Sequence, residues 1–484
     1  MLFAKSAGLS LIKTMIAKLA RASFATGVLL LSLIACLSGQ TKRVRATSEH
    51  LFFRAKMVIN PGTGTTISNA IIETNGGKIL RVGTSQEIPL PSDAKLIDWS
   101  EKYVIPGLVD THGHLYGRLT GSWQTTDALL PVFYLAAGVT TVGDPGSMDP
   151  GGDLALRNRI DSGQYTGPRY FLAGEYIDMP PLIVGWMNPS ATAEEARLKI
   201  DHWSAMGATA TKIYADSSGD IMQAAIDQSH EHGMRVWAHV GAVTYQQAMD
   251  MGVDQLFHGV LAMADTRPPG ITQKDYVAWN QETAQLDLNR REIQQVFRTA
   301  AARKVVLTPT AVVSEIFEPG DQQRHYLDRQ QKYFTPKGWE RIEKIIEGPP
   351  PQGFTAKGIS AEVKKNEEFI RQAHDAGCIL STGTDYVFLS MLPGWSLWRE
   401  LDIFSEAGIR PMDILRAATW NGIYALGRTD QLGSIEAGKL ADFVGLDANP
   451  LENIANVQQV YRVVKGGVIY DPEQLLKPLV GRVE

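Results

Sequence analysis

From residue 104 to residue 430 the sequence alternates short apolar runs with stretches of helical periodicity. Regular alternation of this kind is typical of parallel βα units, in which each strand is followed by a helix that covers the sheet. The predicted strands are VIPGLVDTH, TTVGDP, RYFLAG, ATKIYA, RVWAHV, QLFHG, VVLTPT and ILSTGTD. Eight units of this type predict an α/β fold, a (β/α)8 TIM barrel over residues 105–430.

The two segments that flank this region have a different sequence pattern. Residues 45–104 and 431–484 contain short runs in which apolar and polar residues alternate, and PGTGT and NGGK interrupt these runs in the first segment. This pattern is typical of antiparallel strands joined by tight turns. A chain of 484 residues also exceeds the roughly 250–300 residues at which a single core usually stops growing. We therefore expect both chain ends to form one small β-sandwich domain.

Composition limits the classes of partner. With 44% hydrophobic and 20% charged residues the chain is an ordinary globular protein, and its net charge of −5 gives no electrostatic reason to expect nucleic acid. A small molecule is the expected partner, and the sequence leaves a homo-oligomer open.

The N-terminal segment is typical of an export signal over residues 1–35. Basic residues precede the apolar run FATGVLLLSLIA, which is too short to span a bilayer comfortably, and Cys36 follows. Residues 33–36, LIAC, resemble the bacterial lipobox, which implies cleavage before Cys36 and attachment of lipid to it. An ordinary signal peptide that contains a cysteine is the alternative, and Met15 is an alternative start. We expect a lipoprotein of the bacterial cell envelope, anchored to a membrane on the periplasmic side.

Two histidines separated by one residue occur twice, in different settings. In VIPGLVDTHGHLYG, His112 and His114 end a predicted strand, where residues i and i+2 lie on the same face. In QSHEHG, His230 and His232 close an amphipathic helical run, where a two-residue step turns side chains to nearly opposite faces. We interpret the first pair as able to share a ligand and the second as solvated residues at a helix end.

Further polar residues lie in or at the ends of the predicted strands. The complete set is His112, His114, Lys212, His239, His258 and Asp385. Taken singly, a strand histidine is more often a hydrogen-bonded core residue, and an aspartate after Gly-Thr is more often a turn or a helix cap. In a barrel, however, the C-terminal ends of all strands meet at the face that carries active sites. The set as a whole therefore predicts a functional site.

Several motifs resemble those of the metal-dependent amidohydrolase superfamily, from about residue 50 to 470. They are PGLVDTHGH, TKIYAD, VWAHV with AMDMGVDQLFHG, STGTD and ADFVGLDANPL, and they are most similar to imidazolonepropionase-like and prolidase-like members. The resemblance implies that His112 and His114 bind the more buried of two divalent metal ions. It implies that His239 and His258 bind the more exposed ion.

By the same resemblance Lys212, as a carboxylated lysine, bridges both ions, and Asp385 binds the first ion and acts as the general acid and base. The chemistry is consistent, because imidazole and carboxylate ligands suit Zn²⁺, whereas a protonated lysine with a pKa of about 10.4 would repel two cations. Two ions roughly 3.5–4 Å apart can hold a bridging hydroxide at neutral pH, whose proton Asp385 takes during attack and gives to the leaving nitrogen. We therefore expect a binuclear metal-dependent hydrolase of amide or other C–N bonds.

The prolidase-like motifs favour a dipeptide or an N-acyl amino acid as the substrate, and a cyclic amide is the second candidate. Tyr214, two residues after Lys212, is predicted to contact the substrate. Tyr116 and Arg118, on the loop after the first histidine pair, are also predicted to contact it. Arg118 can hold a carboxylate in a bidentate pair, and a solvated surface arginine is the alternative.

Three aspartates near these motifs are predicted to act indirectly. Asp110 and Asp144 are candidates for orienting imidazoles, with a capping role as the alternative for Asp110, and Asp442 is predicted to be structural.

Two hypotheses from other classes stay open. Lys212 would form a Schiff base in a metal-free lyase, although four histidines at strand ends would then have no role. A non-catalytic lipoprotein that binds a metal or another ligand is the other hypothesis, and the complete set of ligands argues against it.

The lipobox interpretation predicts that the wild-type protein partitions with membranes and that Cys36→Ser releases it or blocks its processing. Membrane fractionation with mass determination of the mature N-terminus measures both effects. Normal cleavage and equal membrane partitioning of the two forms would remove the prediction.

Overall fold

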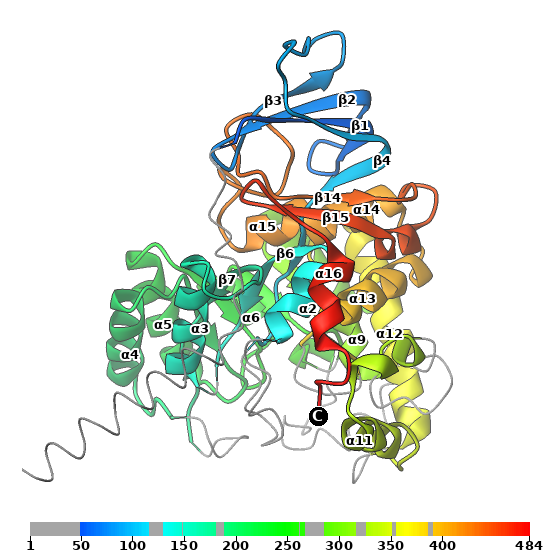
Figure 1. The fold of residues 1–484 in the computed structure, drawn as a ribbon. Coiled ribbons are helices and arrows are strands. Elements are labelled where there is room, and N and C mark those ends of the chain that lie inside the picture. Colours follow the sequence, from blue (N-terminus) through cyan, green and yellow to red (C-terminus); the bar gives the residue numbers. More distant parts are fainter. Residues whose placement is uncertain are drawn as a thin grey trace, which may run out of the picture. The chain divides into compact units, whose positions relative to one another are not determined.

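Seven strands from both ends of the sequence form one sheet (Figure 1). In order across the sheet they are β16 (Val468–Tyr470), β15 (Val460–Lys465), β14 (Phe443–Leu446), β4 (Leu96–Pro106), β1 (Leu51–Asn60), β2 (Thr65–Asn75) and β3 (Lys78–Thr84). The antiparallel pairing of β14 with β4 joins the two chain ends. Phe53, Trp99 and Phe443 are buried here and pack edge to face, with ring centroids 5.1 to 6.0 Å apart. The strand pairing gives a single sheet, and the sandwich stays a prediction.

This computed structural model describes residues 49–115, 129–147, 149–180, 188–260, 262–266, 285–315, 326–350, 355–385 and 391–484. Ala46–Glu484 form one compact unit. Cys36 and the predicted signal peptide lie outside the described residues. Across the part of the chain that is described, no helix has both the length and the apolar character needed to cross a bilayer.

Parallel strands make up the other two sheets. The larger sheet has the order β13 (Ile379–Leu380), β12 (Val306–Thr308), β11 (Gln255–Phe257), β10 (Arg235–Ala238), β9 (Ala210–Ile213) and β8 (Tyr176–Ile177), and the smaller has the order β5 (Leu108–Asp110), β6 (Val139–Asp144) and β7 (Arg169–Leu172). Backbone hydrogen bonds connect their edges, from Thr111 N–H to the Thr382 carbonyl at 3.0 Å and from Thr209 N–H to the Leu172 carbonyl at 2.9 Å. The α/β fold is confirmed, whereas the pairing into two sheets does not itself establish a closed barrel.

Helices separate these strands along the chain. The α-helices of the described residues are α2 (Leu130–Ala136), α3 (Pro150–Asp161), α4 (Ala193–Ala205), α5 (Gly219–Glu231), α6 (Tyr245–Met251), α8 (Arg291–Arg303), α9 (Ala311–Glu315), α11 (Pro336–Ile346), α12 (Ala356–Asp375), α13 (Trp395–Glu406), α14 (Pro411–Arg416), α15 (Gly422–Ala425) and α16 (Pro472–Leu476). Short 3₁₀ helices are η2 (Ala264–Thr266), η5 (Gln331–Tyr333), η7 (Ile454–Gln458) and η8 (Lys477–Leu479), and η6 (Ala417–Asn421) is a π-helical turn. Threonine side chains cap several N-termini by accepting a backbone N–H three residues ahead, as Thr192 and Thr355 do.

The segment VIPGLVDTH, predicted as one strand, is divided between two sheets. Residues 104–106 complete β4 in the seven-stranded sheet, and β5 begins at Leu108 and pairs with β6. Gly107 lies between them, and a β-carbon at this position would collide with the Thr140 side chain, so a larger residue would not fit there without a shift. Since β5 ends at Asp110, His112 and His114 lie beyond the strand, and the prediction that a strand presents them on one face is wrong.

Asp442 ties the seven-stranded sheet to the parallel strands. Its buried carboxylate accepts bonds from Nε and Nη2 of Arg169 on β7, at 2.7 and 3.0 Å, and from the N–H of Gly466 at 2.7 Å. A bidentate guanidinium pair in this geometry is both strong and directional. The contacts agree with the structural role predicted for Asp442.

Asp442→Asn should lower the free energy of unfolding by about 2–3 kcal/mol, because it leaves the Arg169 charge without its buried partner. Asp447→Asn is the matched control, since Asp447 pairs with Lys102 at 2.6 Å but its side chain is 46% exposed. That exposed pair should contribute less than about 1 kcal/mol. Equal destabilisation of the two variants in urea unfolding would contradict the assignment.

Candidate metal centre

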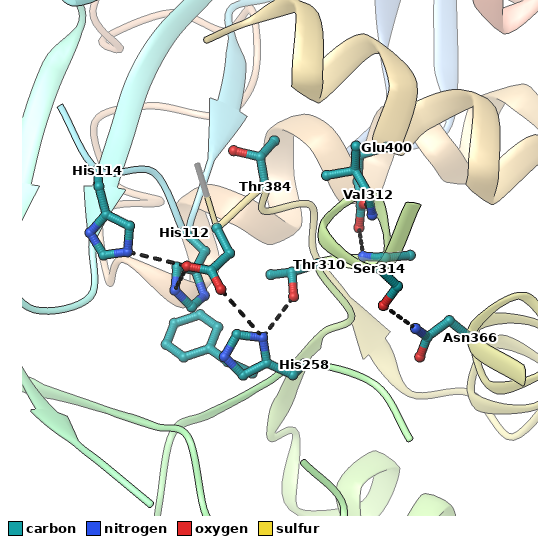
Figure 2. Close-up of polar contacts among 12 residues, drawn as sticks. His112, His114, His258, Thr310, Val312, Ser314, Asn366, Thr384 and Glu400 are labelled. Atoms are coloured by element: carbon teal, nitrogen blue, oxygen red, sulfur yellow. Dashed lines mark hydrogen bonds and ion pairs between the residues drawn. The ribbon is translucent and has the colours of Figure 1, made fainter. Parts of the chain in front are cut away.

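Three predicted metal ligands converge in the structure. Oδ1 of Asp385 lies 3.1 Å from Nε2 of His112 and 3.3 Å from Nε2 of His114, and the two imidazoles are labelled in Figure 2. One donor atom from each of the three residues lies within 4.8 Å of the other two. Two imidazoles and a carboxylate at this spacing form a donor set that suits a divalent cation such as Zn²⁺.

Asp110 explains why these segments meet although they are distant in the sequence. Its fully buried carboxylate accepts the N–H of His112 at 3.0 Å, and it accepts the N–H and the hydroxyl of Thr384 at 3.1 and 2.7 Å. The N–H of Asp385 donates a further bond to the His112 carbonyl at 2.7 Å. Asp110 thus orients the backbone of the first histidine rather than an imidazole ring.

Burial and the neighbouring charges set the protonation of these ligands. Burial lowers the pKa of His112 to about 3 despite the nearby Asp385, so its imidazole is neutral and keeps a lone pair for a metal ion. Burial also acts to lower the pKa of His114, but Asp144 and Asp385 outweigh it and raise the value to about 10. Burial would raise the pKa of Asp385, yet the imidazoles hold it well below its usual range. Positive charge is therefore favoured on His114, which lies between two carboxylates, and disfavoured on His112.

A second pair of histidines adjoins the first group. His239 follows β10 and His258 follows β11, and their ring centroids are 4.3 Å apart. The His258 ring lies 5.1 Å from the His112 ring, and its Nδ1 is 3.9 Å from Oδ2 of Asp385. Burial lowers the pKa of His258 well below its ordinary value, which keeps the ring neutral. The structure thus gathers these four histidines with Asp385, and their roles as ligands remain proposals.

Lys212 lies on β9, as predicted, and its amine is buried among aromatic rings. Nζ is 4.3 Å from the centroid of the Phe257 ring, which is itself 4.3 Å from the His112 ring. Among the described residues Nζ has no hydrogen-bond partner. Burial lowers the pKa of Lys212 to about 7 although Asp385 and Asp144 oppose the shift. A buried ammonium group without hydrogen-bond acceptors is costly, so the site favours the neutral amine, which is the form that can be carboxylated.

The structure describes some of the remaining residues singled out from the sequence and not others. The Tyr214 ring lies 4.8 Å from the His239 ring, which agrees with a position beside the second histidine pair. Tyr116 and Arg118 lie outside the described residues. His230 and His232 are at the C-terminal end of α5, where they pair with Asp254 and Asp201 at 3.1 and 2.6 Å. This pair is a helix-end pair, as predicted.

A network of buried hydrogen bonds holds the Nδ1 side of the His114 imidazole. Nδ1 of His114 bonds Asp144 at 2.9 Å, and the hydroxyl of Tyr170 bonds the carboxylates of both Asp144 and Asp153. An imidazole whose Nδ1–H is held by a carboxylate presents the Nε2 lone pair to a metal ion. The sequence suggested Asp144 alone. Tyr170 and Asp153 lie in no motif, so only the structure reveals them.

Backbone strain gathers at the same place. Among the described residues, five non-glycine residues have positive φ, and three of these are His258 at 71°, Thr310 at 47° and Asp385 at 47°. Each such conformation costs on the order of 1–3 kcal/mol, and for the β-branched Thr310 it is a clear outlier. The hydroxyl of Thr310 bonds Nδ1 of His258 at 2.8 Å. Thr310 is not among the residues predicted from the sequence, although it ends the predicted strand VVLTPT with a polar side chain, as the predicted residues do.

Comparison with known proteins identifies the family. The model of the Amidohydrolase family matches residues 103–470. This chain belongs to the amidohydrolase family. The resemblance found in the sequence is therefore confirmed.

Curated relatives match over shorter stretches. The imidazolonepropionase of Bacteroides fragilis is 34% identical over 108 residues, which are 21% of this chain and 25% of that protein.

An uncharacterized protein of Mycobacterium tuberculosis is 28% identical to this amidohydrolase over 182 residues, which are 34% of this chain and 46% of that protein. The chain thus spans a quarter to about half of the length of these two relatives.

Solved structures share the fold of this amidohydrolase. A bottromycin amidohydrolase superposes with a TM-score of 0.69 at 20% identity and covers 91% of this chain and 92% of its own. A putative prolidase from Bifidobacterium longum gives a TM-score of 0.64 at 24% identity, with coverage of 89% and 99%. At these identities the similarity shows a common fold.

Replacing His112 with Asn in this amidohydrolase should weaken Zn²⁺ binding by at least about 100-fold, because loss of even an outer partner of a ligand typically costs 10–100-fold. His230→Asn is the matched control, as it removes an imidazole at a helix end. Competition with a chromogenic chelator measures both affinities. Similar affinities for the two variants would contradict the assignment of His112 as a ligand.

Proposed function

We propose that this amidohydrolase hydrolyses amide or other C–N bonds with the help of two divalent metal ions, Zn²⁺ being the expected metal. The first ion would be held by His112, His114 and Asp385. The second would be held by His239 and His258. The observation that carries the proposal is the approach of both Nε2 atoms of the first pair to one oxygen of Asp385. The backbone bonds across both sheet edges support a closed (β/α)8 barrel around this site.

Lys212 is proposed to bridge the two ions as a carboxylated lysine. With a pKa lowered to about 7 by burial, much of the amine is unprotonated near neutral pH. An unprotonated amine can add to carbon dioxide, forming an N–C bond and releasing one proton. The product is an anionic carbamate, whose oxygens would be available to the metal ions in place of an ammonium charge. The same neutral amine also suits a Schiff base, and trapping with borohydride and a carbonyl substrate would reveal that alternative.

Asp385 is proposed to move the proton. Bound divalent ions would polarise the scissile carbonyl and lower the pKa of a water molecule from 15.7 toward about 7. The imidazoles hold the pKa of Asp385 well below its usual range, so the carboxylate begins the reaction ionised. It takes the proton of the attacking water and returns it to the leaving nitrogen, which prevents the nitrogen from leaving as an anion. His112 and His258 are neutral and serve coordination alone.

A dipeptide or an N-acyl amino acid is the substrate class we favour. Support comes from the prolidase-like motifs and from similarity to the putative prolidase structure. Similarity to imidazolonepropionase favours a cyclic amide as the second candidate. Tyr214, whose ring lies beside that of His239, is proposed to contact the substrate. Tyr116 and Arg118, which follow the first histidine pair in the sequence, are proposed to contact it as well.

The location and assembly of the protein are proposals as well. The lipobox-like LIAC supports export and a lipid anchor on Cys36 in the bacterial cell envelope. A non-catalytic lipoprotein that binds a metal or ligand remains the competing hypothesis, and a homo-oligomer stays open.

Screening the zinc-loaded protein against dipeptides, N-acyl amino acids and cyclic amides tests the proposed function. Turnover of one class, abolished by a chelator and restored by Zn²⁺, is the expected result. Full zinc occupancy without hydrolysis of any member would favour the non-catalytic hypothesis.

Asp385→Asn separates proton transfer from metal binding. The amide is nearly isosteric with the carboxylate, so the variant should keep most of its zinc, but it cannot carry the proton. Because general acid–base transfer typically contributes about 10²–10⁴-fold, kcat should fall by at least that range while KM changes little. The measurement is kcat at confirmed full zinc occupancy. Activity within a few-fold of the wild type would show that another group moves the proton.

A further inference from the structure

His258 is supported by a threonine that closes the loop after β12. Nδ1 of His258 bonds the hydroxyl of Thr310 at 2.8 Å, and both residues are labelled in Figure 2. When Nδ1–H donates to this oxygen, Nε2 keeps the lone pair that a metal ion requires. Thr310 has φ of 47°, and the backbone of His258 is also in the left-handed region at 71°. The contact therefore depends on two strained residues that other parts of the chain must hold in place.

α13 holds the segment that begins directly after Thr310. The carboxylate of Glu400 accepts the N–H of Ala311 at 3.2 Å and that of Val312 at 2.8 Å, one bond to each oxygen. Glu400 is fully buried, and Figure 2 shows its carboxylate directed at Val312. These N–H groups belong to the first turn of α9 and have no acceptor within the helix. Burial raises the pKa of Glu400 to about 8, although the bonds from these two N–H groups oppose the shift.

The opposite end of α9 is held by the same helix. Nε and Nη2 of Arg399, the residue before Glu400, bond the carboxylate of Glu315 at 2.7 and 2.5 Å. Arg399 and Glu315 are buried, so this pair is protected from water. α13 thus holds both ends of α9.

Asn366 on α12 connects α9 to the loop after His258. Its amide oxygen accepts the N–H of Val260 at 3.1 Å, and its amide nitrogen donates to the hydroxyl of Ser314 at 3.1 Å. A β-carbon on Gly259 would overlap this amide oxygen, so glycine is required there. The loops after β11 and β12 are therefore fixed relative to each other by buried polar groups outside the metal centre.

We propose that Thr310 and Glu400 are positioning residues for His258. Glu400 fixes the first turn of α9, α9 holds Thr310 in its left-handed conformation, and Thr310 sets the tautomer and orientation of the imidazole. The inference rests on the proposed function, because it assigns His258 to a metal ion. It goes beyond the ligand set, since neither residue touches the substrate or the ion.

The contribution of the hydroxyl is tested with Thr310→Val and Thr310→Ser. Valine keeps the branched shape but cannot accept the Nδ1–H, whereas serine retains the oxygen. Thr310→Val should weaken Zn²⁺ binding by about 10–100-fold, the usual effect of removing an outer partner of a metal ligand, and Thr310→Ser should restore most of the affinity. Chelator competition measures the affinity without a substrate.

The contribution of Glu400 is tested with Glu400→Gln, which retains one acceptor and places an amide N–H₂ against a backbone N–H. Zinc affinity should fall by about 10-fold, and kcat should fall with KM nearly unchanged. Glu73→Gln is the matched control, because Glu73 is also a buried glutamate held by hydrogen bonds, to Arg81 at 2.5 Å and to His50 at 2.7 Å, but it lies on β2 of the seven-stranded sheet. The control should lower the Tm and leave the zinc affinity unchanged.

The double variant Thr310→Val with Glu400→Gln decides whether the two residues act in series. Residues that act through one another give non-additive losses, so the double variant should bind zinc about as well as Thr310→Val alone. Additive losses, or a Glu400→Gln affinity equal to that of the wild type, would overturn the role of Glu400. If Glu400→Gln does not fold, equal affinities of Thr310→Val and Thr310→Ser would still overturn the inference. A wild-type protein that binds no zinc would overturn the proposed function as well.

Discussion

The hydrogen bonds of Asp110 are the constraint on which the rest of the site depends. This carboxylate lies at the end of β5 and binds the backbone of His112 on its own segment and of Thr384 on the segment after β13. Burial raises its pKa to about 6 even with these donors, which shows how dry the position is. A buried carboxylate is tolerated only where its oxygens are satisfied, so the two segments must stay together in the folded protein. The approach of Asp385 to the first histidine pair follows from that requirement.

The charged groups near the Asp110 hydrogen bonds are arranged so that few of the charges lack a partner. Asp144 and Asp153 both bond Tyr170, and burial together with the neighbouring Asp144 raises the pKa of Asp153 well above its ordinary value. These surroundings favour the protonated form of Asp153, while Oδ1 of Asp144 lies 2.9 Å from Nδ1 of His114. Asp385 lies on the other side of that imidazole. Two carboxylates around buried imidazoles leave a place for a cation, and a bound ion would offset charges that are otherwise costly to bury.

Local rules predicted much of this arrangement from the sequence. Each of the eight predicted strand segments contains an observed strand, because apolar runs between helical stretches report burial directly. The candidate site residues were found because histidine, lysine and aspartate side chains are unusual in and at the ends of short apolar strands. Gly107 was read as part of one continuous strand, because the sequence does not show that β4 and β5 pair with different sheets.

The supporting residues could not be predicted in the same way. Glu400 lies in the helix α13, and its sequence neighbours give no sign that it binds the first turn of α9. Tyr170 is an ordinary residue of β7 until Asp144 and Asp153 are placed beside it. Their roles arise from contacts across 17 to 89 positions of the sequence, whereas periodicity and spacing report only local structure. Thr310 is intermediate, because its position at a strand end was visible and its strained backbone was not.

The central claim is a pair of metal ions bridged by a modified Lys212, and an anomalous difference map from crystals of the zinc-loaded protein tests it most directly. The account predicts two peaks roughly 3.5–4 Å apart. One should lie about 2.0–2.2 Å from ligand atoms of His112, His114 and Asp385, and the other at that distance from His239 and His258, with extra density for a carboxylate on Nζ of Lys212. A single fully occupied zinc beside an unmodified Lys212 would contradict the account.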